Sequence, residues 1–248
     1  METIIKASQP LNLEGAFNVR DLGGYVNKNG IELKRQMFLR SDGLQNLTEC
    51  DCRFLKEYGV RLVIDLRTDM ELEREPSKMR DYEEVEYINI PLIDNVQSNG
   101  LKGLLPNSLQ ELYIGLLDNS KDLIKEILGS MVEHKDECVL FNCTAGKDRT
   151  GVIAMLLLNL AEVSDEVIIE DYRVTEGNMK SVFHKQKEEM KALGFEVPEF
   201  LLKSEKEYME ETLEYFKEKY GSSKRYMSEI GLSHEEIEIL ENKLIKGV

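Results

Sequence analysis

One stretch of this 248-residue chain constrains the fold more than any other: CVLFNCTAGKDRTGVIAMLLLNL, at residues 138–160. Its apolar run Val139–Phe141 is typical of a buried strand, and a second apolar segment begins at Thr150. Cys143 and Arg149 lie between the two segments, with five residues separating them. This order predicts a strand, an anion-binding loop and a helix.

The loop contains the residue types that bind phosphate. Small residues at Thr144, Ala145 and Gly146 allow the backbone to curl, so that successive N–H groups converge beside a helix N-terminus. Arg149 adds a planar guanidinium group that can bind two phosphate oxygens and stabilise a phosphoryl group in transfer. The same dipoles favour a thiolate over a thiol at Cys143, which we therefore expect to be the nucleophile.

Residues 143–151, CTAGKDRTG, resemble the signature loop of the cysteine-dependent phosphatases, in the version found in bacterial tyrosine and dual-specificity phosphatases, some of which also act on phosphoinositides. The resemblance covers nearly the whole chain, through NVRDLGGY, FLRSDGL, VIDLRTDMELE, DYRVTEGNM and YGSSKRYMSEIGLS at residues 18–25, 38–44, 63–73, 171–179 and 220–233. It implies an α/β fold, with a parallel or mixed sheet flanked by helices and an all-helical C-terminal part. It also implies a phosphomonoester hydrolase that acts through a cysteinyl-phosphate intermediate.

Site roles follow from this resemblance. Cys143 attacks the phosphorus, while Arg149 and the amides of residues 144–147 hold the phosphoryl group, and Thr150 hydrogen-bonds the departing thiolate. Asn142 stands where most relatives carry histidine, and we expect its amide to hydrogen-bond the loop backbone. The general acid is either Asp148, inside the loop, or Asp94, in the preceding segment NIPLIDN. We favour Asp148 because the rigid loop keeps it near the leaving oxygen.

Lys147 is a cation in an anion-binding loop of a protein whose net charge is −15. One phosphate needs only Arg149 and the loop amides, so Lys147 is expected to bind a second phosphate, as in a phosphoinositide headgroup. The alternative is that Lys147 points to solvent or pairs with a nearby carboxylate.

Composition limits the classes of protein that remain. Hydrophobic residues make up 42% of the chain, enough for a full core without disulfides. The four cysteines show no CxxC spacing, so we expect reduced thiols and a cytoplasmic location. No signal-peptide core and no run near the ~18 apolar residues of a membrane span are seen. The excess of 47 acidic over 32 basic residues argues against nucleic acid as a partner.

The scattered histidines His134, His184 and His234 have no metal-ligand spacing, so neither a metal nor a cofactor is expected. A phosphorylated protein or a phosphoinositide is the expected substrate, and the oligomeric state stays open. Two rival functions remain. Arsenate reduction or sulfur transfer would need a resolving cysteine, for which the buried Cys138 is a poor candidate. A phosphate-binding pseudophosphatase would agree with Asn142 but not with the retained loop residues.

Local patterns predict the other elements. Asn29-Gly30 is typical of a hairpin turn, and Thr48 with Asp51 forms a capping box for a helix that ends at Gly59. Arg67 and Glu71 have the four-residue spacing of a helical ion pair, so Arg67 is interpreted as structural. Strands are expected at residues 37–40, 62–64 and 85–90, and helices at 109–117 and 123–132.

We expect residues 1–248 to form a single phosphatase domain. Everything beyond Ser164 has helical periodicity, and Ser233 with Glu236 caps a last helix. In related phosphatases, helices from the region that corresponds to residues 178–204 cover the active site, so this segment is either a helical lid or a set of ordinary core helices. Residues 205–248 then form the C-terminal helices.

Overall fold

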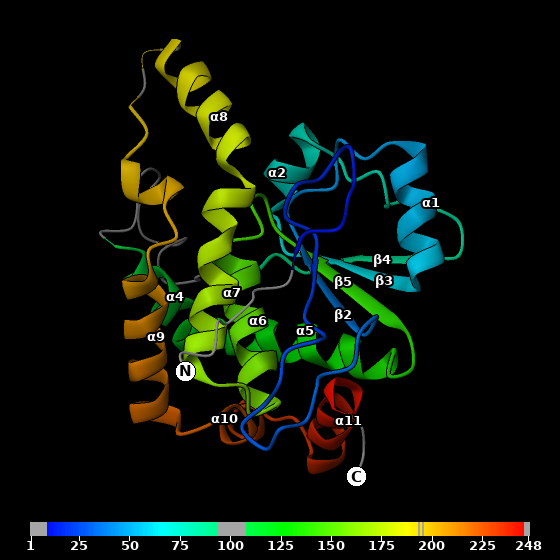
Figure 1. Cartoon of the computed structure of the whole chain (residues 1–248), viewed down its shortest axis with the longest axis vertical. Helices are drawn as coiled ribbons and strands as arrows, with labels where there is room; N and C mark the ends of the chain where they lie inside the picture. The colour runs from blue at the N-terminus through cyan, green and yellow to red at the C-terminus, as the bar shows by residue number, and fades with distance from the viewer. Residues whose placement is uncertain (1–8, 94–107, 193, 195, 246–248) are drawn as a thin grey trace.

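The computed structural model describes residues 9–93, 108–192, 194 and 196–245 (Figure 1). The strands are β1 (Arg20–Asp21), β2 (Phe38–Ser41), β3 (Val60–Asp65), β4 (Glu86–Asn89) and β5 (Cys138–Asn142). The helices are α1 (Glu49–Tyr58), α2 (Asp69–Arg74), α4 (Leu109–Asn119), α5 (Lys121–Glu133), α6 (Asp148–Leu160), α7 (Asp165–Asn178), α8 (Lys180–Ala192), α9 (Lys206–Tyr220), α10 (Ser223–Glu229) and α11 (His234–Leu244), with a 3₁₀ turn η1 (Glu199–Leu202).

The strands form one mixed sheet in the order β1-β2-β5-β3-β4. Only β1 is antiparallel to its neighbour, while β2, β5, β3 and β4 are mutually parallel. In this register Asn142 at the end of β5 lies between Ser41 of β2 and Asp65 of β3. The carboxyl ends of three strands therefore meet at the point where the Cys143 loop begins, which is the edge where α/β folds place ligands.

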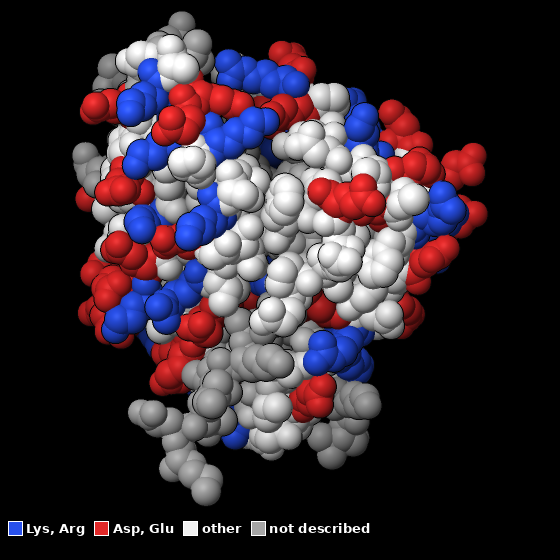
Figure 2. Space-filling view, turned by 45° about the horizontal axis from the view of Figure 1, so that its top comes forward, with Lys and Arg blue, Asp and Glu red and all other residues white. Residues whose placement is uncertain are grey.

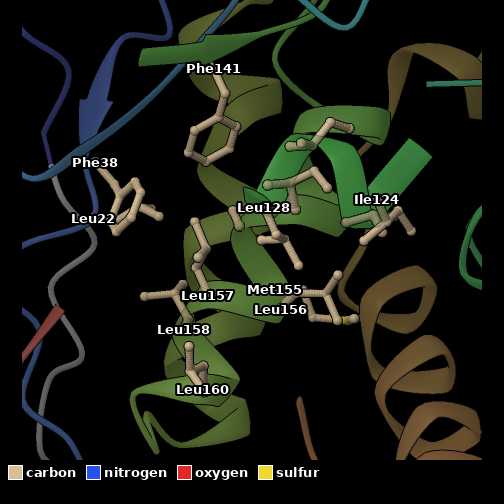
Figure 3. Close-up of a cluster of buried hydrophobic side chains, with 14 of the residues drawn as sticks. Leu22, Phe38, Ile124, Leu128, Phe141, Met155, Leu156, Leu157, Leu158 and Leu160 are labelled. Atoms are coloured by element: carbon tan, nitrogen blue, oxygen red, sulfur yellow. The ribbon is translucent and has the colours of Figure 1, made fainter. Parts of the chain in front are cut away.

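Both faces of the sheet are buried, as the alternation along its strands requires. Along β5, Val139 and Phe141 pack on the larger hydrophobic cluster, among α4, α5 and α6, whereas Leu140 faces the smaller cluster beneath α1. Figure 3 shows Phe141 and Phe38 directed toward the leucines of α6. Helix α6 packs against α4, α7, α10 and α11, and nearly all of its side chains are buried. The helix that follows the loop is thus held on several sides.

These observations confirm the expected fold class, an α/β sheet flanked by helices with a helical C-terminal part. The capping boxes Thr48–Asp51 and Ser233–Glu236 are both formed, and Gly59 ends α1 in the left-handed conformation. At the expected hairpin, Val26 pairs with Glu32 in an antiparallel bridge around Gly30. Helix α6 begins at Asp148, two residues earlier than the apolar pattern indicated. Asp94 lies outside the described residues.

Helix α8 follows α7 closely and projects beyond the carboxyl edge of the sheet (Figure 1). Of its side chains only Phe183 is buried, so α8 is not an ordinary core helix. On the face shown in Figure 2, basic and acidic side chains are interspersed. Pairs such as Lys185–Glu189 and Lys187–Glu199 join several of the charges of this region. Among the described helices none is both long and apolar enough to cross a membrane.

Candidate active site

The loop between β5 and α6 has its carbonyl groups turned outward. The carbonyl of Thr144 accepts the amide of Gly43 at 3.1 Å, and that of Ala145 accepts Nδ2 of Asn18 at 3.0 Å. The carbonyl of Gly146 accepts Nη2 of Arg40 at 2.6 Å. In a trans peptide the following N–H points away from the carbonyl. The amides of residues 145–147 therefore point to the opposite side of the loop, as an anion-binding nest requires.

Gly146 is required by this conformation. Its φ is +64°, in the left-handed region, and a Cβ at this position would lie 2.6 Å from the carbonyl carbon of Ser41. A side chain would push the loop away from β2. Cys143, the first residue after β5, is only 2% exposed and lies at the base of this loop.

Arg149 is fixed by a bidentate ion pair that the sequence patterns did not identify. Its Nη1 and Nη2 donate to the two carboxylate oxygens of Glu71, on α2, at 2.8 and 2.7 Å. Nη2 also reaches Oγ1 of Thr144 at 3.2 Å. Burial alone would raise the pKa of Glu71, but Arg149 outweighs it and holds that pKa well below its usual range. Glu71 is therefore ionised and orients the guanidinium beside the loop.

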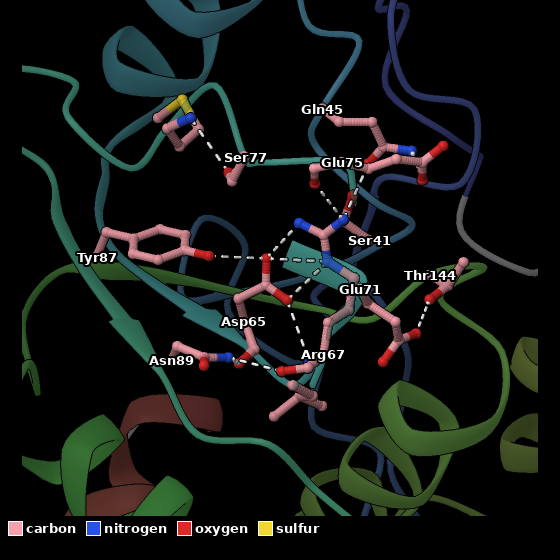
Figure 4. A network of polar contacts seen from close by, with 12 residues as sticks. Ser41, Gln45, Asp65, Arg67, Glu71, Glu75, Ser77, Tyr87, Asn89 and Thr144 are labelled. Carbon is pink, nitrogen blue, oxygen red and sulfur yellow. Dashed lines mark hydrogen bonds and ion pairs between the residues drawn. The ribbon is translucent and has the colours of Figure 1, made fainter. Parts of the chain in front are cut away.

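The expected Arg67–Glu71 ion pair is wrong. Arg67 binds both carboxylate oxygens of Asp65 and the carbonyl of Glu75, while Glu71 is turned toward Thr144 (Figure 4). The side chain of Arg67 is 1% exposed and saturated with protein acceptors, which agrees with a structural role. The sequence contained a signal against the Arg67–Glu71 ion pair. Thr68 and Glu71 have the spacing of a capping box, and they form one at the N-terminus of α2.

A buried polar network holds the loop from outside. Nη1 of Arg20 bonds Oδ1 of Asn18, and Nη1 of Arg40 bonds Oδ2 of Asp171. Asp171 also accepts the hydroxyl of Tyr25 at 2.9 Å, and Arg20 donates to its carbonyl at 2.7 Å. Nδ2 of Asn178 reaches Oδ1 of Asn18 at 3.0 Å. Three sequence motifs far apart in the chain thus converge on two loop carbonyls.

The network carries a net positive charge. Burial lowers the pKa of Arg20 to about 10, although Asp171 opposes this shift, so Arg20 stays protonated at neutral pH. Burial alone would raise the pKa of Asp171, but Arg40 and Arg20 outweigh it and the pKa is lowered. Two arginines thus face one carboxylate in a site from which water is excluded. The unbalanced charge favours an anion at the neighbouring loop.

Asp42 connects the N-terminal segment to the same region. Its carboxylate oxygens accept the amides of Phe17 and Asn18 at 3.1 and 2.9 Å, yet burial dominates and raises the pKa of Asp42 to about 6. This group therefore titrates within reach of physiological pH.

Two buried residues that flank the loop keep unpartnered polar atoms within the described structure: both side-chain polar atoms of Asn142, and Oγ1 of Thr150. The expectation that Asn142 hydrogen-bonds the loop backbone is therefore wrong. Asn142 is paired in the sheet with Ser41 on one side and Asp65 on the other, and the residue is fully buried.

Lys147 does not offer its ammonium group to a second phosphate. The side chain is 1% exposed, and Nζ donates to the carbonyls of Leu201 and Lys203 at 2.6 and 2.8 Å. Nζ also lies 3.5 Å from Oδ1 of Asp148. The expectation of a second phosphate contact is thus at odds with this position, and so is a side chain that points to solvent, whereas the alternative of pairing with a nearby carboxylate is met by Asp148. Lys147 instead ties the η1 turn to the loop.

Asp148 is the first residue of α6, and its side chain is 28% exposed. Its Oδ1 accepts the hydroxyl of Tyr113, on α4, at 2.6 Å. Cys143, Asp148 and Arg149 are therefore all at or beside the loop, as the sequence pattern indicated, and Thr150 is one residue further along α6.

A cleft of about 480 Å³ opens beside Thr144, between the N-terminal segment and the first half of α8. Its ionisable lining residues are Glu14, Asp42, Glu75, Lys185 and Glu189. Helix α8 therefore borders the cleft beside the loop, and the wall of this cleft is predominantly acidic.

The cysteines are all unpaired. Cys138 and Cys143 lie at opposite ends of β5, about 16 Å apart at the usual rise per strand residue. Burial raises the pKa of the Cys138 thiol far above its usual range. Among the described residues no cluster of His, Cys, Asp or Glu has the arrangement of a metal site.

A buried cysteine at the end of the central parallel strand, an amide nest and a carboxylate-oriented arginine form an arrangement suited to binding an anion beside a thiol. A family model described as the tyrosine phosphatase family matches residues 11–246, and the chain belongs to this family.

A tyrosine-protein phosphatase of Nostoc commune is 37% identical over 140 residues, which are 56% of this chain and 48% of that protein. The triple specificity protein phosphatase PtpB of Mycobacterium tuberculosis is 25% identical over 190 residues, 64% of this chain and 67% of that protein. A crystal structure of P. aeruginosa TpbA aligns with a TM-score of 0.36 and 14% identity, over 60% of this chain and 78% of that one. The chain spans about half the length of the Nostoc protein.

Proposed function

We propose that this protein is a phosphomonoester phosphatase in which Cys143 forms a cysteinyl-phosphate intermediate. The thiolate attacks phosphorus, so that the S–P bond forms while the bond to the leaving oxygen breaks and Asp148 donates a proton to that oxygen. The carboxylate of Asp148 then takes a proton from water as the water attacks phosphorus. The S–P bond breaks, inorganic phosphate leaves, and Thr150 donates a hydrogen bond to the departing thiolate.

One observation carries the proposal: Arg149 is held by both oxygens of Glu71 at the mouth of a loop whose carbonyls are bonded away from it. A guanidinium and amides fixed in this way need little reorganisation when charge develops on the phosphoryl oxygens. The unpartnered, buried hydroxyl of Thr150 gives further support, because a thiolate would satisfy it.

The substrate class we propose is a phosphorylated protein, with phosphotyrosine as the first choice and dual specificity as an extension. The cleft beside Thr144 presents Glu14, Glu75 and Glu189 to any group attached to the bound phosphate. Such a wall repels a polyanionic headgroup and attracts basic peptide residues. Since Lys147 is already occupied by carbonyls, phosphoinositides are the less favoured substrate. A reducing, cytoplasmic location is part of the proposal, because the nucleophile must stay reduced.

A catalytically weak phosphate-binding protein is the second candidate, favoured by the unpartnered amide of Asn142 next to the nucleophile. Arsenate reduction is less favoured, because Cys138 lies at the other end of β5, and Cys50 and Cys52 lie on α1.

The test compares wild type, Cys143→Ser and the matched control Cys50→Ser, which changes an exposed cysteine on α1. Each protein is assayed on phosphotyrosine and phosphothreonine peptides, on inositol polyphosphates, and on arsenate with a thiol reductant. We expect turnover of the peptides by wild type and by the control, and none by Cys143→Ser, which should still bind phosphate. Equal turnover by Cys143→Ser would refute the mechanism. Phosphate binding without turnover in wild type would establish the second candidate.

A further inference from the structure

Two buried tyrosines form a hydrogen-bonded chain that ends on Asp148. The hydroxyl of Tyr113, on α4, lies 2.6 Å from Oδ1 of Asp148 and 2.7 Å from the hydroxyl of Tyr172, on α7. The two rings meet edge to face, with centroids 5.9 Å apart. Both side chains lie in the main core, 0% and 1% exposed. A phenylalanine would fill this apolar space equally well at either position. The two hydroxyl groups are therefore explained by the carboxylate of Asp148, which Tyr113 contacts directly and Tyr172 contacts through Tyr113.

When Asp148 is ionised, the hydrogen bonds of this chain have only one consistent direction. A phenol has a single hydrogen, and Tyr113 donates it to Oδ1 of Asp148. Tyr172 must then donate to the oxygen of Tyr113. Burial raises the pKa of Tyr113 well above its usual value, so the donor keeps its proton across the range of an assay. Nζ of Lys147 lies 3.5 Å from the same Oδ1.

We propose that Tyr113, supported by Tyr172, is a positioning residue that directs proton transfer to Oδ2 of Asp148. This inference rests on the proposed phosphatase reaction. Oδ1 is occupied as an acceptor by a hydroxyl and lies near an ammonium group, so the acidic hydrogen of the neutral carboxyl is on Oδ2. The Oδ2–H bond breaks as the leaving oxygen gains the proton. The bond from Tyr113 then strengthens, because its acceptor has become an anion.

In the second half of the reaction the same arrangement leaves Oδ2 free to take a proton from the attacking water. Tyr113 therefore holds one oxygen of the carboxyl group while the other alternates between acid and base. A merely structural tyrosine would contribute to folding and leave the protonation of the leaving group unaffected.

The experiment compares Tyr113→Phe and Tyr172→Phe with the control Tyr226→Phe. Tyr226 is also fully buried, and its hydroxyl donates to the carbonyl of Leu117 at 2.8 Å, so the control removes a similar bond away from Asp148. For each variant kcat, KM and thermal stability are measured on aryl phosphates with good leaving groups and on alkyl phosphates with poor ones. General acid catalysis contributes about 10²–10⁴-fold, and it matters most when the leaving group is poor.

We expect Tyr113→Phe to lower kcat about tenfold on alkyl phosphates and less than about threefold on activated aryl phosphates, with KM little changed. Tyr172→Phe should show a smaller effect of the same kind, and Tyr226→Phe only a change in stability. In an Asp148→Asn background, Tyr113→Phe should have no further effect on alkyl phosphates, because the group that it positions can no longer donate the proton.

Equal losses on both substrate types, or additive losses in the double variant, would overturn the inference. The inference would also be overturned if Asp148→Asn slowed alkyl and aryl phosphates equally, because the general acid would then be another residue. These outcomes differ from failure of the proposed function, which would appear as Cys143-independent turnover or as no turnover in wild type. If Tyr113→Phe does not fold, Tyr172→Phe decides the question, because it leaves the direct bond to Asp148 in place.

Discussion

The orientation of Arg149 by Glu71 can be tested with one substitution, Glu71→Gln. Glutamine at the third residue of a helix still completes a capping box with Thr68, so α2 should persist. What changes is the ion pair: one charged oxygen becomes an NH₂ group that faces the guanidinium, and the other becomes a neutral acceptor. The substitution therefore weakens the contacts of Glu71 with Arg149 and Thr144 while leaving the fold of α2 in place.

The expected magnitude follows from the geometry. Hydrogen bonds to charged groups contribute about 1.5–3 kcal/mol. The side chains of Arg149 and Glu71 are 19% and 32% exposed, so solvent screening places the loss at the lower end of that range, at about 1.5 kcal/mol. Because ~1.4 kcal/mol corresponds to one decade, kcat/KM should fall about tenfold. The inhibition constant of inorganic phosphate should rise in parallel, since the ground state uses the same guanidinium.

The assay is hydrolysis of an aryl phosphate, with thermal unfolding to monitor the fold. Glu73→Gln is the matched control, because Glu73 lies on the same helix with an exposed side chain. A fall of less than about threefold in Glu71→Gln, or an equal fall in the control, would refute the argument that Glu71 orients Arg149.

Two further predictions follow from buried groups. Burial raises the pKa of Asp42 from 3.8 to about 6, so the folded state retains a proton that the unfolded chain has released. As the pH rises from 3.8 to about 6, the free energy of unfolding of the wild type should therefore fall relative to that of Asp42→Asn, as measured by urea unfolding. Parallel pH profiles of the two proteins would contradict this. Lys147→Ala removes the bonds to the carbonyls of Leu201 and Lys203, so amide exchange should increase at residues 199–204. We expect kcat/KM to fall equally for a phosphotyrosine peptide and an inositol polyphosphate, and a loss about tenfold greater for the latter would restore a second-phosphate role.

Sequence patterns predicted the central strand, loop and helix because these depend on local preferences. An apolar run, small residues and a capping box each act over a few positions, and most of the expected elements are formed. Gly146 illustrates this, since its left-handed backbone is a local requirement that its residue type reveals.

The partner of Arg149 was missed for a physical reason. The four-residue spacing from Arg67 to Glu71 applies only inside a helix, and Arg67 precedes Thr68, which is the N-cap of α2. The hydrogen bonds of Lys147 and of Asp171 join residues 54 to 151 positions apart, so they depend on tertiary packing that no local pattern records. Periodicity identifies a residue as buried but not the atom that it meets.

The buried network explains how a chain with a net charge of −15 presents an anion site. Surface charges beyond a Debye length of roughly 8–10 Å are screened, so the acidic residues distant from the loop have little effect on it. Arg20, Arg40 and Arg149 act from positions where water is largely excluded, and there their interaction with a bound anion is stronger. Arg40 contributes twice, by its charge and by fixing the carbonyl of Gly146 outward. The net charge of the protein is therefore compatible with the proposed phosphate site, because the buried charges lie closest to the loop.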